Sequence, residues 1–188
     1  MDHRAHFPKA VLGPQINRTQ GTLPHDLVKI GRLPAKKWRD CRRLRLEAPK
    51  KDPAAFSSSY EEEKVLTEEE WRRRTKNTLF AIADGIPVGS IGYNFNTKKK
   101  TRHIAGIFGV YVTASHRGQG IGRMLVKGAL SRIRGKKGIL KVQLSVNSEL
   151  GPALELYKNS GFVVTGMATK ELRIGPRFYD LLYMEKEL

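Results

Sequence analysis

The sequence contains one cysteine among its 188 residues, Cys41, and it has no long hydrophobic run. A single cysteine cannot form an intramolecular disulfide, and this favours a reducing compartment. A membrane span needs about 18 consecutive apolar residues, so we expect none. The start of the chain also lacks the order of positive, apolar and small residues that is typical of a secretory signal. We therefore predict a cytoplasmic location and no membrane partner.

Acidic residues are scarce: 18 Asp and Glu stand against 35 Lys and Arg, which gives a net charge of +17. A charge of this size attracts polyanions, so a nucleic acid or a ribosome surface is one candidate partner. It equally suits an enzyme whose cosubstrate carries several phosphates. The basic residues are scattered in short clusters, and aromatic residues do not alternate with them. That distribution favours the enzyme, and nucleic-acid binding stays as the alternative.

The length of the chain fits one domain with a substantial core. Residues 1–23 mix Pro, Gly, His and basic residues without periodicity, and we predict that they form a flexible lead. Residues 24–188 are predicted to form a single domain. There is no internal repeat, and no metal site is predicted.

Hydrophobic periodicity in the rest of the chain predicts six to seven strands and about four helices, a mixed α/β fold. A Thr67 to Glu70 capping box starts the second helix, and the Asp84 to Pro87 segment marks a hairpin. The stretch after Pro49 begins as a loop. Strands are expected at residues 27–33, 78–83, 88–95, 104–112, 140–146, 162–170 and 177–184. Helices are expected after Pro34, after Thr67, from Ile121 and from Pro152 to a left-handed cap at Gly161.

Three glycines lie where the fourth strand turns into the helix that begins near Ile121: Gly118, Gly120 and Gly122. The first amides of a helix have no partner inside the helix, and the helix dipole adds positive character there. Glycines let an anion approach the backbone closely, and Arg117 can add a forked, charged contact. This turn is therefore predicted to bind a phosphate group.

Two common phosphate motifs do not fit this turn. A P-loop ends in Gly-Lys-Ser/Thr, whereas Arg123 and Met124 follow Gly122. The dinucleotide fingerprint needs two residues between its second and third glycines, and only Ile121 separates Gly120 from Gly122. It also needs an acidic residue about 20 positions later, and residues 139–146 contain none. Both readings are therefore excluded.

The turn instead resembles the acyl-CoA site of the GNAT-type N-acetyltransferases. That family has Arg or Gln, two residues, Gly, one residue and Gly or Ala, and Arg117, Gly120 and Gly122 match in order. Its second signature is Ala, two residues, Leu-Tyr, three residues and Gly-Phe, and residues 153–162 match every fixed position. The two motifs lie about 35 residues apart with a strand between them, so chance agreement of both is improbable. The order of the predicted elements matches the family's architecture as well.

The resemblance implies a mostly antiparallel sheet that is splayed between its fourth and fifth strands. It also implies acetyl-CoA as the cosubstrate and transfer of the acetyl group to a primary amine by direct attack in a ternary complex. Tyr157 corresponds to the family's general acid, and a tyrosine stays protonated at neutral pH. The cofactor is expected to bind at Val110, Tyr111, Val112, Arg117, Gly118, Gln119, Gly120, Ile121, Gly122 and Arg123.

One position departs from the family pattern, because Leu150 stands where Asn is common. Asn147 is therefore predicted to contact the cofactor arm in its place. The general base stays open among Tyr111, Glu149, the cluster at residues 61–63 and a chain of water molecules. The acceptor is expected to be an amine-bearing small molecule or protein, with residues 56–71 lining its site. The protein is expected to be a monomer or a homodimer.

Overall fold

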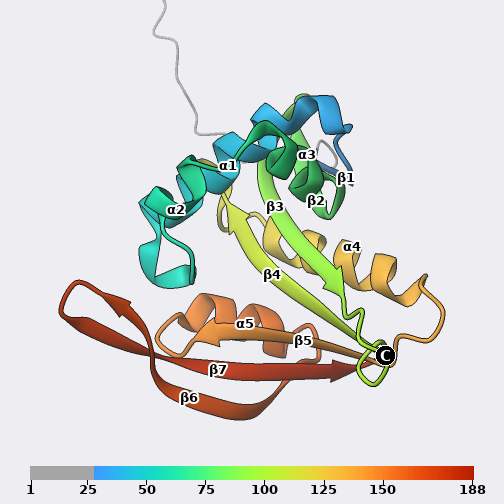
Figure 1. Ribbon diagram of the computed structural model, residues 1–188, viewed down its shortest axis with the longest axis vertical. Helices are drawn as coiled ribbons and strands as arrows, with labels where there is room; N and C mark the ends of the chain where they lie inside the picture. Colours follow the sequence, from blue (N-terminus) through green and yellow to red (C-terminus); the bar gives the residue numbers. More distant parts are fainter. Residues whose placement is uncertain (1–27) are drawn as a thin grey trace, which may run out of the picture.

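The computed structural model describes residues 28–188 (Figure 1), so the lead predicted at residues 1–23 lies outside the described part. Seven strands form one sheet in the order β1-β2-β3-β4-β5-β7-β6. The strands are β1 (Val28–Gly31), β2 (Thr78–Ala83), β3 (Ile86–Phe95), β4 (Ile104–Val112), β5 (Lys141–Asn147), β6 (Val163–Ile174) and β7 (Arg177–Glu187). The helices are α1 (Trp38–Lys51), α2 (Tyr60–Lys64), α3 (Glu68–Lys76), α4 (Ile121–Arg134) and α5 (Gly151–Lys158), with 3-10 turns at Ala35–Lys37, Pro53–Ala55 and Ala114–His116.

Neighbouring strands are antiparallel everywhere except between β4 and β5. These two parallel strands pair only through residues 104–106 of β4 and 141–143 of β5. Beyond that point β4 diverges from β5, and Figure 1 shows the two strands separating toward the end of β4 that leads to α4. The edge of β4 that faces β5 therefore has no strand partner from residue 107 onward. The predicted splay is confirmed.

Turn residues place the strands much as the sequence indicates. Asp84 and Gly85 both have positive φ, 48° and 77°, which gives the tight turn that joins β2 to β3. Gly175, with φ of 57°, makes the corresponding turn between β6 and β7. Because that turn is so short, β6 runs further than predicted, to Ile174. β7 also runs further, to Glu187, because its last residues pair with the start of β5.

The helices differ from expectation in two places. Pro49 does not end α1, which continues to Lys51, because the proline lies in the last turn and the Asp52 amide still bonds the Ala48 carbonyl. The additional helix α2 was not predicted, although Ser59 and Glu62 form the same reciprocal capping box as Thr67 and Glu70 do at α3. Three helices therefore separate β1 from β2. Among residues 28–188, no helix combines the length and the apolar character that crossing a bilayer requires.

The sheet separates two hydrophobic cores, one on each face. Helix α4 buries Ile121, Leu125 and Ile133 against one face, and Tyr157 of α5 belongs to the same core. Helices α1 and α3 cover the other face, where the second core includes Trp71 and Tyr111. The predicted apolar face of α1 is confirmed, since its residues Trp38, Cys41, Leu44 and Ala48 are all buried. Side chains from both cores, Tyr157 from one and Tyr111 from the other, therefore lie near the place where β4 diverges from β5.

Candidate active site

A cavity of about 370 Å³ lies where β4 ends and α4 begins, and we call it the cradle cavity. Its walls come from the end of β4, the turn into α4, the first turn of α4, one side of α5 and the segment after α1. Most of the predicted site residues line it together: Val110, Tyr111, Val112, Arg117, Gly118, Gly120, Ile121, Gly122 and Tyr157. The other lining residues are Asp52, Ala55, Phe56, His116, Leu150, Pro152, Ala153 and Leu156.

Glycines shape the turn at one end of this cavity. Gly118 and Gly120 have φ of 76° and 74°, a left-handed conformation that side chains rarely adopt, and Gly120 is the residue before the first turn of α4. A Cβ on Gly118 would meet no atom within 4 Å, so that position is open. Gly122 has another function, because a Cβ there would lie 3.2 Å from the Leu156 side chain of α5, which would have to shift. At residues 118, 120 and 122 the backbone at the start of α4 therefore lines the cavity without side chains of its own.

Arg117 is held at the mouth of the cavity by two contacts. Its Nε donates a hydrogen bond to the Val112 carbonyl at 2.9 Å, and its terminal nitrogens form an ion pair with Asp52. The hydrogen bond to Asp52 raises the pKa of Arg117, and the guanidinium also lies over the Tyr111 ring at 5.6 Å. An anion that enters the cavity therefore meets the oriented guanidinium of Arg117, which in this structure is paired with the partly exposed carboxylate of Asp52.

Tyr157 reaches the cavity from α5 and is buried. Its ring packs edge-on against Phe162, with ring centres 6.1 Å apart. Burial raises the pKa of Tyr157 to about 12, so the hydroxyl is protonated throughout the neutral range. Among residues 28–188 this hydroxyl donates no hydrogen bond, which leaves its proton available to a group bound in the cavity.

Comparison with known proteins identifies the family. The model of the Acetyltransferase (GNAT) family matches residues 38–162, which is more than half of the chain and contains both the turn and Tyr157. The chain belongs to the GNAT acetyltransferase family. It is therefore an acyltransferase.

Individual relatives are distant. The chain is 24% identical over 108 residues to the L-amino acid N-acetyltransferase AaaT of Escherichia coli strain K12, a match that spans 57% of this chain and just under two thirds (66%) of that protein. A GNAT-family acetyltransferase from Streptococcus pneumoniae has the same fold, with 23% identity and a TM-score of 0.77 over 86% of this chain and 99% of that one. The yncA protein of Salmonella typhimurium, solved with its cofactor acetyl-CoA, gives 17% identity and a TM-score of 0.73, covering 85% and 93%.

Three residues expected to bind the cofactor of this acetyltransferase do not line the cradle cavity. Gln119 bonds the Ser115 carbonyl at 3.4 Å, and Arg123 is exposed on the first turn of α4. Asn147 is buried, and both ends of its amide are engaged: the nitrogen donates to the Ala54 carbonyl at 3.0 Å, and the oxygen accepts from the Glu149 amide at 2.9 Å. In this structure Asn147 therefore connects β5 to the 3-10 turn after α1. Its contact with a cofactor stays a prediction.

Four of the five side chains named as candidates for the general base are engaged in other interactions, and the fifth, Glu61, is exposed and does not line the cradle cavity. The Tyr111 hydroxyl donates to Glu47 Oε1 at 2.8 Å, and burial together with this carboxylate raises its pKa, so it is poorly suited to accept a proton. Glu149 is exposed and paired with Arg177 at 2.7 Å, and Glu62 caps α2. Glu63 is buried between two arginines.

Sequence reasoning missed the carboxylates that organise this GNAT site, Glu47 and Asp52. Each is about 65 positions from the residue it contacts, Tyr111 and Arg117 respectively. The one available signal was that Glu47 and Asp52 lie shortly before residues 56–71, which were expected to line the acceptor site. No spacing along the chain indicates which side chains they meet.

Proposed function

We propose that this protein is an acetyl-CoA-dependent N-acetyltransferase that transfers the acetyl group to a primary amine by direct attack in a ternary complex. One observation carries the proposal. The cradle cavity brings together the unpaired edge of β4, the glycine-bordered start of α4 and the hydroxyl of Tyr157. These groups suit a cosubstrate that has a diphosphate at one end and a thioester at the other.

Each group has a task in this proposal. The first amides of α4 and the Arg117 guanidinium hold the diphosphate. The unpaired edge of β4 at Val110 to Val112 holds the arm and the thioester carbonyl, where a backbone amide stabilises the oxyanion that develops during attack. Acetyl-CoA supplies the activated acyl group. Tyr157 donates its hydrogen to the thiolate as that group leaves.

The residues around the cavity support direct attack. Within residues 28–188, no serine or cysteine lines the cradle cavity, so the cavity lacks the hydroxyl or thiol nucleophile that most covalent acyl transfers use. Cys41 is buried on the other face of the sheet, and burial raises its pKa, which disfavours the reactive thiolate. The new N–C bond forms as the C–S bond breaks. The proton of the amine leaves through water, since the candidate glutamates do not line the cradle cavity and the Tyr111 hydroxyl donates to Glu47.

Isothermal titration with acetyl-CoA and with CoA tests the proposal, alongside free-thiol detection with a panel of small amines. A basic protein binds polyanions without specificity, so ATP serves as the matched control for charge. We expect CoA to bind at least tenfold more tightly than ATP, because only CoA carries an arm that can lie along β4. Equal affinities, or no binding of acetyl-CoA, would remove the proposal.

A further inference from the structure

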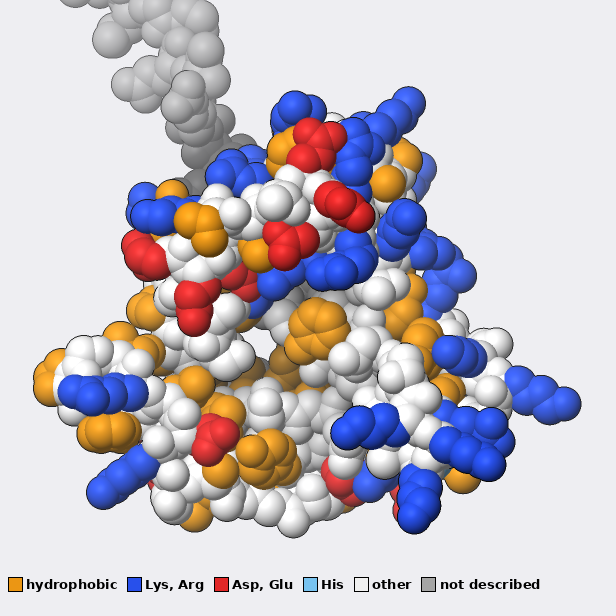
Figure 2. Space-filling view, viewed as in Figure 1, with side chains coloured by type: hydrophobic (Ala, Val, Ile, Leu, Met, Phe, Trp, Pro, Cys, Tyr) orange, Lys and Arg blue, Asp and Glu red, His pale blue; other side chains and the backbone are white. Residues whose placement is uncertain are grey.

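A second cavity, of about 360 Å³, lies on the opposite face of the sheet, under α1, α2 and α3 and over β3 and β4. We call it the arginine cavity, after Arg45, Arg73 and Arg74 in its walls; the other lining residues are Cys41, Ser58, Glu63, Asn77, Thr78, Ser90, Gly92, Phe108 and Gly109. Figure 2 shows this face of the molecule hollowed between the helices α1 to α3 and the strands β5 to β7, with Lys and Arg side chains at the edge of the hollow. Its size suits a small molecule.

One buried carboxylate, that of Glu63, pairs with two of the three arginines. Glu63 is only 2% exposed and accepts hydrogen bonds from Arg45 Nε at 2.9 Å, Arg45 Nη2 at 2.6 Å and Arg74 Nη1 at 2.7 Å. Ser58 also donates to it, at 2.6 Å. Burial acts to raise the pKa of Glu63, but the bonds from Arg45 and Ser58 outweigh it and hold the pKa below its usual range. Glu63 is therefore ionised and compensates one of the positive charges that surround it.

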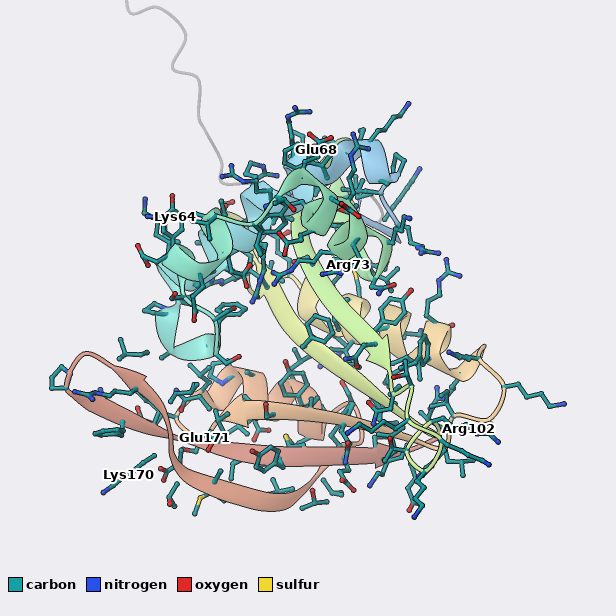
Figure 3. The ribbon with its side chains drawn as sticks, viewed as in Figure 1. Lys64, Glu68, Arg73, Arg102, Lys170 and Glu171 are labelled. Atoms are coloured by element: carbon teal, nitrogen blue, oxygen red, sulfur yellow. The ribbon has the colours of Figure 1, made fainter. Side chains whose placement is uncertain are left out.

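The remaining charge of the arginine cavity is not compensated by the described residues. Arg73 pairs with no carboxylate among residues 28–188, and Arg74 gives only one nitrogen to Glu63. Three arginines and one carboxylate line the cavity, so two positive charges remain. In Figure 3, Arg73 lies on the side of α3 that faces β3, whereas Glu68 lies on the far side of that helix. The exposed guanidinium groups of Arg73 and Arg74 are the donors that a bound anion would meet.

The two cavities adjoin across β4. The register between β3 and β4 shifts beside Gly109, which has φ of 59°; Phe108 and Gly109 line the arginine cavity, while Val110 lines the cradle cavity. A Cβ at position 109 would come within 3.2 Å of Arg45 Nη1, so glycine lets this arginine approach the strand. Arg45 also lies over the ring of Phe56, a residue of the cradle cavity, at 5.0 Å. A molecule in the arginine cavity can therefore present a group to the thioester near Val110.

We propose that the arginine cavity binds the carboxylate of the acceptor, so that the acceptor is a small amine that also carries a carboxylate, such as an amino acid. This rests on the acetyltransferase function proposed above. The guanidinium fork matches a carboxylate in shape and charge. The exposed apolar ring of Phe108 lies in the same cavity as the arginines and can contact an uncharged side chain of the bound acceptor.

The positive cavity also affects the reacting amine. A protonated amine without a carboxylate would meet two uncompensated like charges, and its binding would be disfavoured. If the acceptor also carries a carboxylate, the arginines attract that carboxylate, and this attraction offsets the repulsion of the ammonium group. The same positive field lowers the pKa of its ammonium group and increases the neutral fraction that attacks. One set of arginines therefore selects the acceptor and prepares its nitrogen.

The test compares glycine, L-leucine, L-methionine and L-glutamate, each with its α-carboxamide, on the full chain. The rate of thiol release gives kcat/KM, and calorimetry gives the Kd of each acceptor with and without CoA. We expect at least one amino acid to exceed its amide by tenfold or more in both measurements. In Arg73→Gln this preference should fall at least fivefold, mainly through KM, and Arg73→Lys should retain part of it.

Arg72→Gln is the matched control, because Arg72 is the neighbouring arginine of α3 and pairs with Glu68 at 2.6 Å outside the cavity. It should keep the preference of the wild type. The inference is overturned if no amino acid is preferred to its amide, or if Arg73→Gln keeps the full preference. Failure of CoA to bind would instead remove the proposed function, and the acceptor titrations without CoA would still decide whether the arginines bind a carboxylate.

Discussion

Replacing Tyr157 by phenylalanine removes one oxygen atom from the cradle cavity and keeps the ring that packs against Phe162. Because the hydroxyl makes no hydrogen bond among residues 28–188, the variant leaves no internal group without its partner. We therefore expect the free energy of unfolding to change by less than about 1 kcal/mol. Any loss of activity can then be attributed to the chemistry of the hydroxyl.

The size of that loss follows from the acidity of Tyr157. Its pKa is raised to about 12 by burial, whereas a free thiol has a pKa of about 8.5, so full proton transfer from the buried hydroxyl to a thiolate of that pKa would be uphill by about 5 kcal/mol. Dry surroundings also raise the pKa of the departing thiol, which narrows the gap. A hydrogen bond donated to the developing thiolate needs no full transfer. We expect kcat to fall about 10²- to 10³-fold in Tyr157→Phe, with less than about a threefold change in the Kd of acetyl-CoA.

The pH profile gives an independent reading. Since the pKa of Tyr157 is raised, its proton is lost only as the pH approaches about 12, so kcat of the wild type should not decline between about pH 7 and pH 10.

Tyr93→Phe is the matched control for Tyr157→Phe, because Tyr93 is buried in the same core and does not line the cradle cavity. A kcat of Tyr157→Phe within threefold of the wild type would refute the donor role. Equal losses in both variants would point to packing instead.

Three further substitutions test other parts of the account. Asp52→Asn frees Arg117 from its half-exposed partner, and calorimetry should show CoA binding two- to fivefold more tightly; unchanged or weaker binding would contradict this competition. Gly120→Ala puts a side chain at φ of 74°, which costs about 1–2 kcal/mol and should lower Tm by about 2–8 °C, with a smaller rise of Tm on adding CoA; an unaltered Tm would argue against the strain. Glu63→Gln leaves its two arginine partners uncompensated and should destabilise the fold by about 3–5 kcal/mol at pH 7. Because the pKa of Glu63 is lowered in the fold from its ordinary value of 4.5, its full contribution is present above about pH 4.5 and is lost as the pH falls through the folded pKa. The two proteins should therefore converge in stability in acid, and a constant difference between their denaturant melts would count against this pair.

Local signals in the sequence predicted most of the elements. The Asp84–Gly85 turn, the Thr67 capping box and the left-handed Gly161, with φ of 84°, all lie where their residues indicated. Such signals act within one turn of chain, so they can be recognised without the rest of the fold. Helix α2 has the same kind of signal at Ser59 and could have been predicted in the same way.

The interactions that set the electrostatics of the site could not be predicted in this way. Glu47 contacts Tyr111, and Asp52 contacts Arg117, only because α1 packs beside the end of β4. Asn147 is likewise occupied by the carbonyl of Ala54, 93 positions away. These pairings depend on tertiary packing. The sequence therefore indicated which groups line the cradle cavity but not which partners hold them.

Arg45 is an instructive intermediate case. Cys41 lies four residues before Arg45 and Ala48 three residues after it, so all three share one face of α1. The Arg45 guanidinium is therefore a positive charge on an otherwise buried face. Such a position indicates a buried ion pair. The sequence indicates its partner, Glu63, only as a candidate base, whereas in the structure Glu63 pairs with Arg45 and Arg74.

The central claim is that CoA binds with its diphosphate at the start of α4 and its sulfur beside Tyr157. A crystal structure of the CoA complex tests this most directly. The account predicts diphosphate oxygens about 3 Å from backbone nitrogens of residues 118–122, the arm along the unpaired edge of β4, and the Arg117 guanidinium turned from Asp52 toward the phosphates. CoA bound at another surface, or a cradle cavity left empty with the Arg117 ion pair intact, would contradict it.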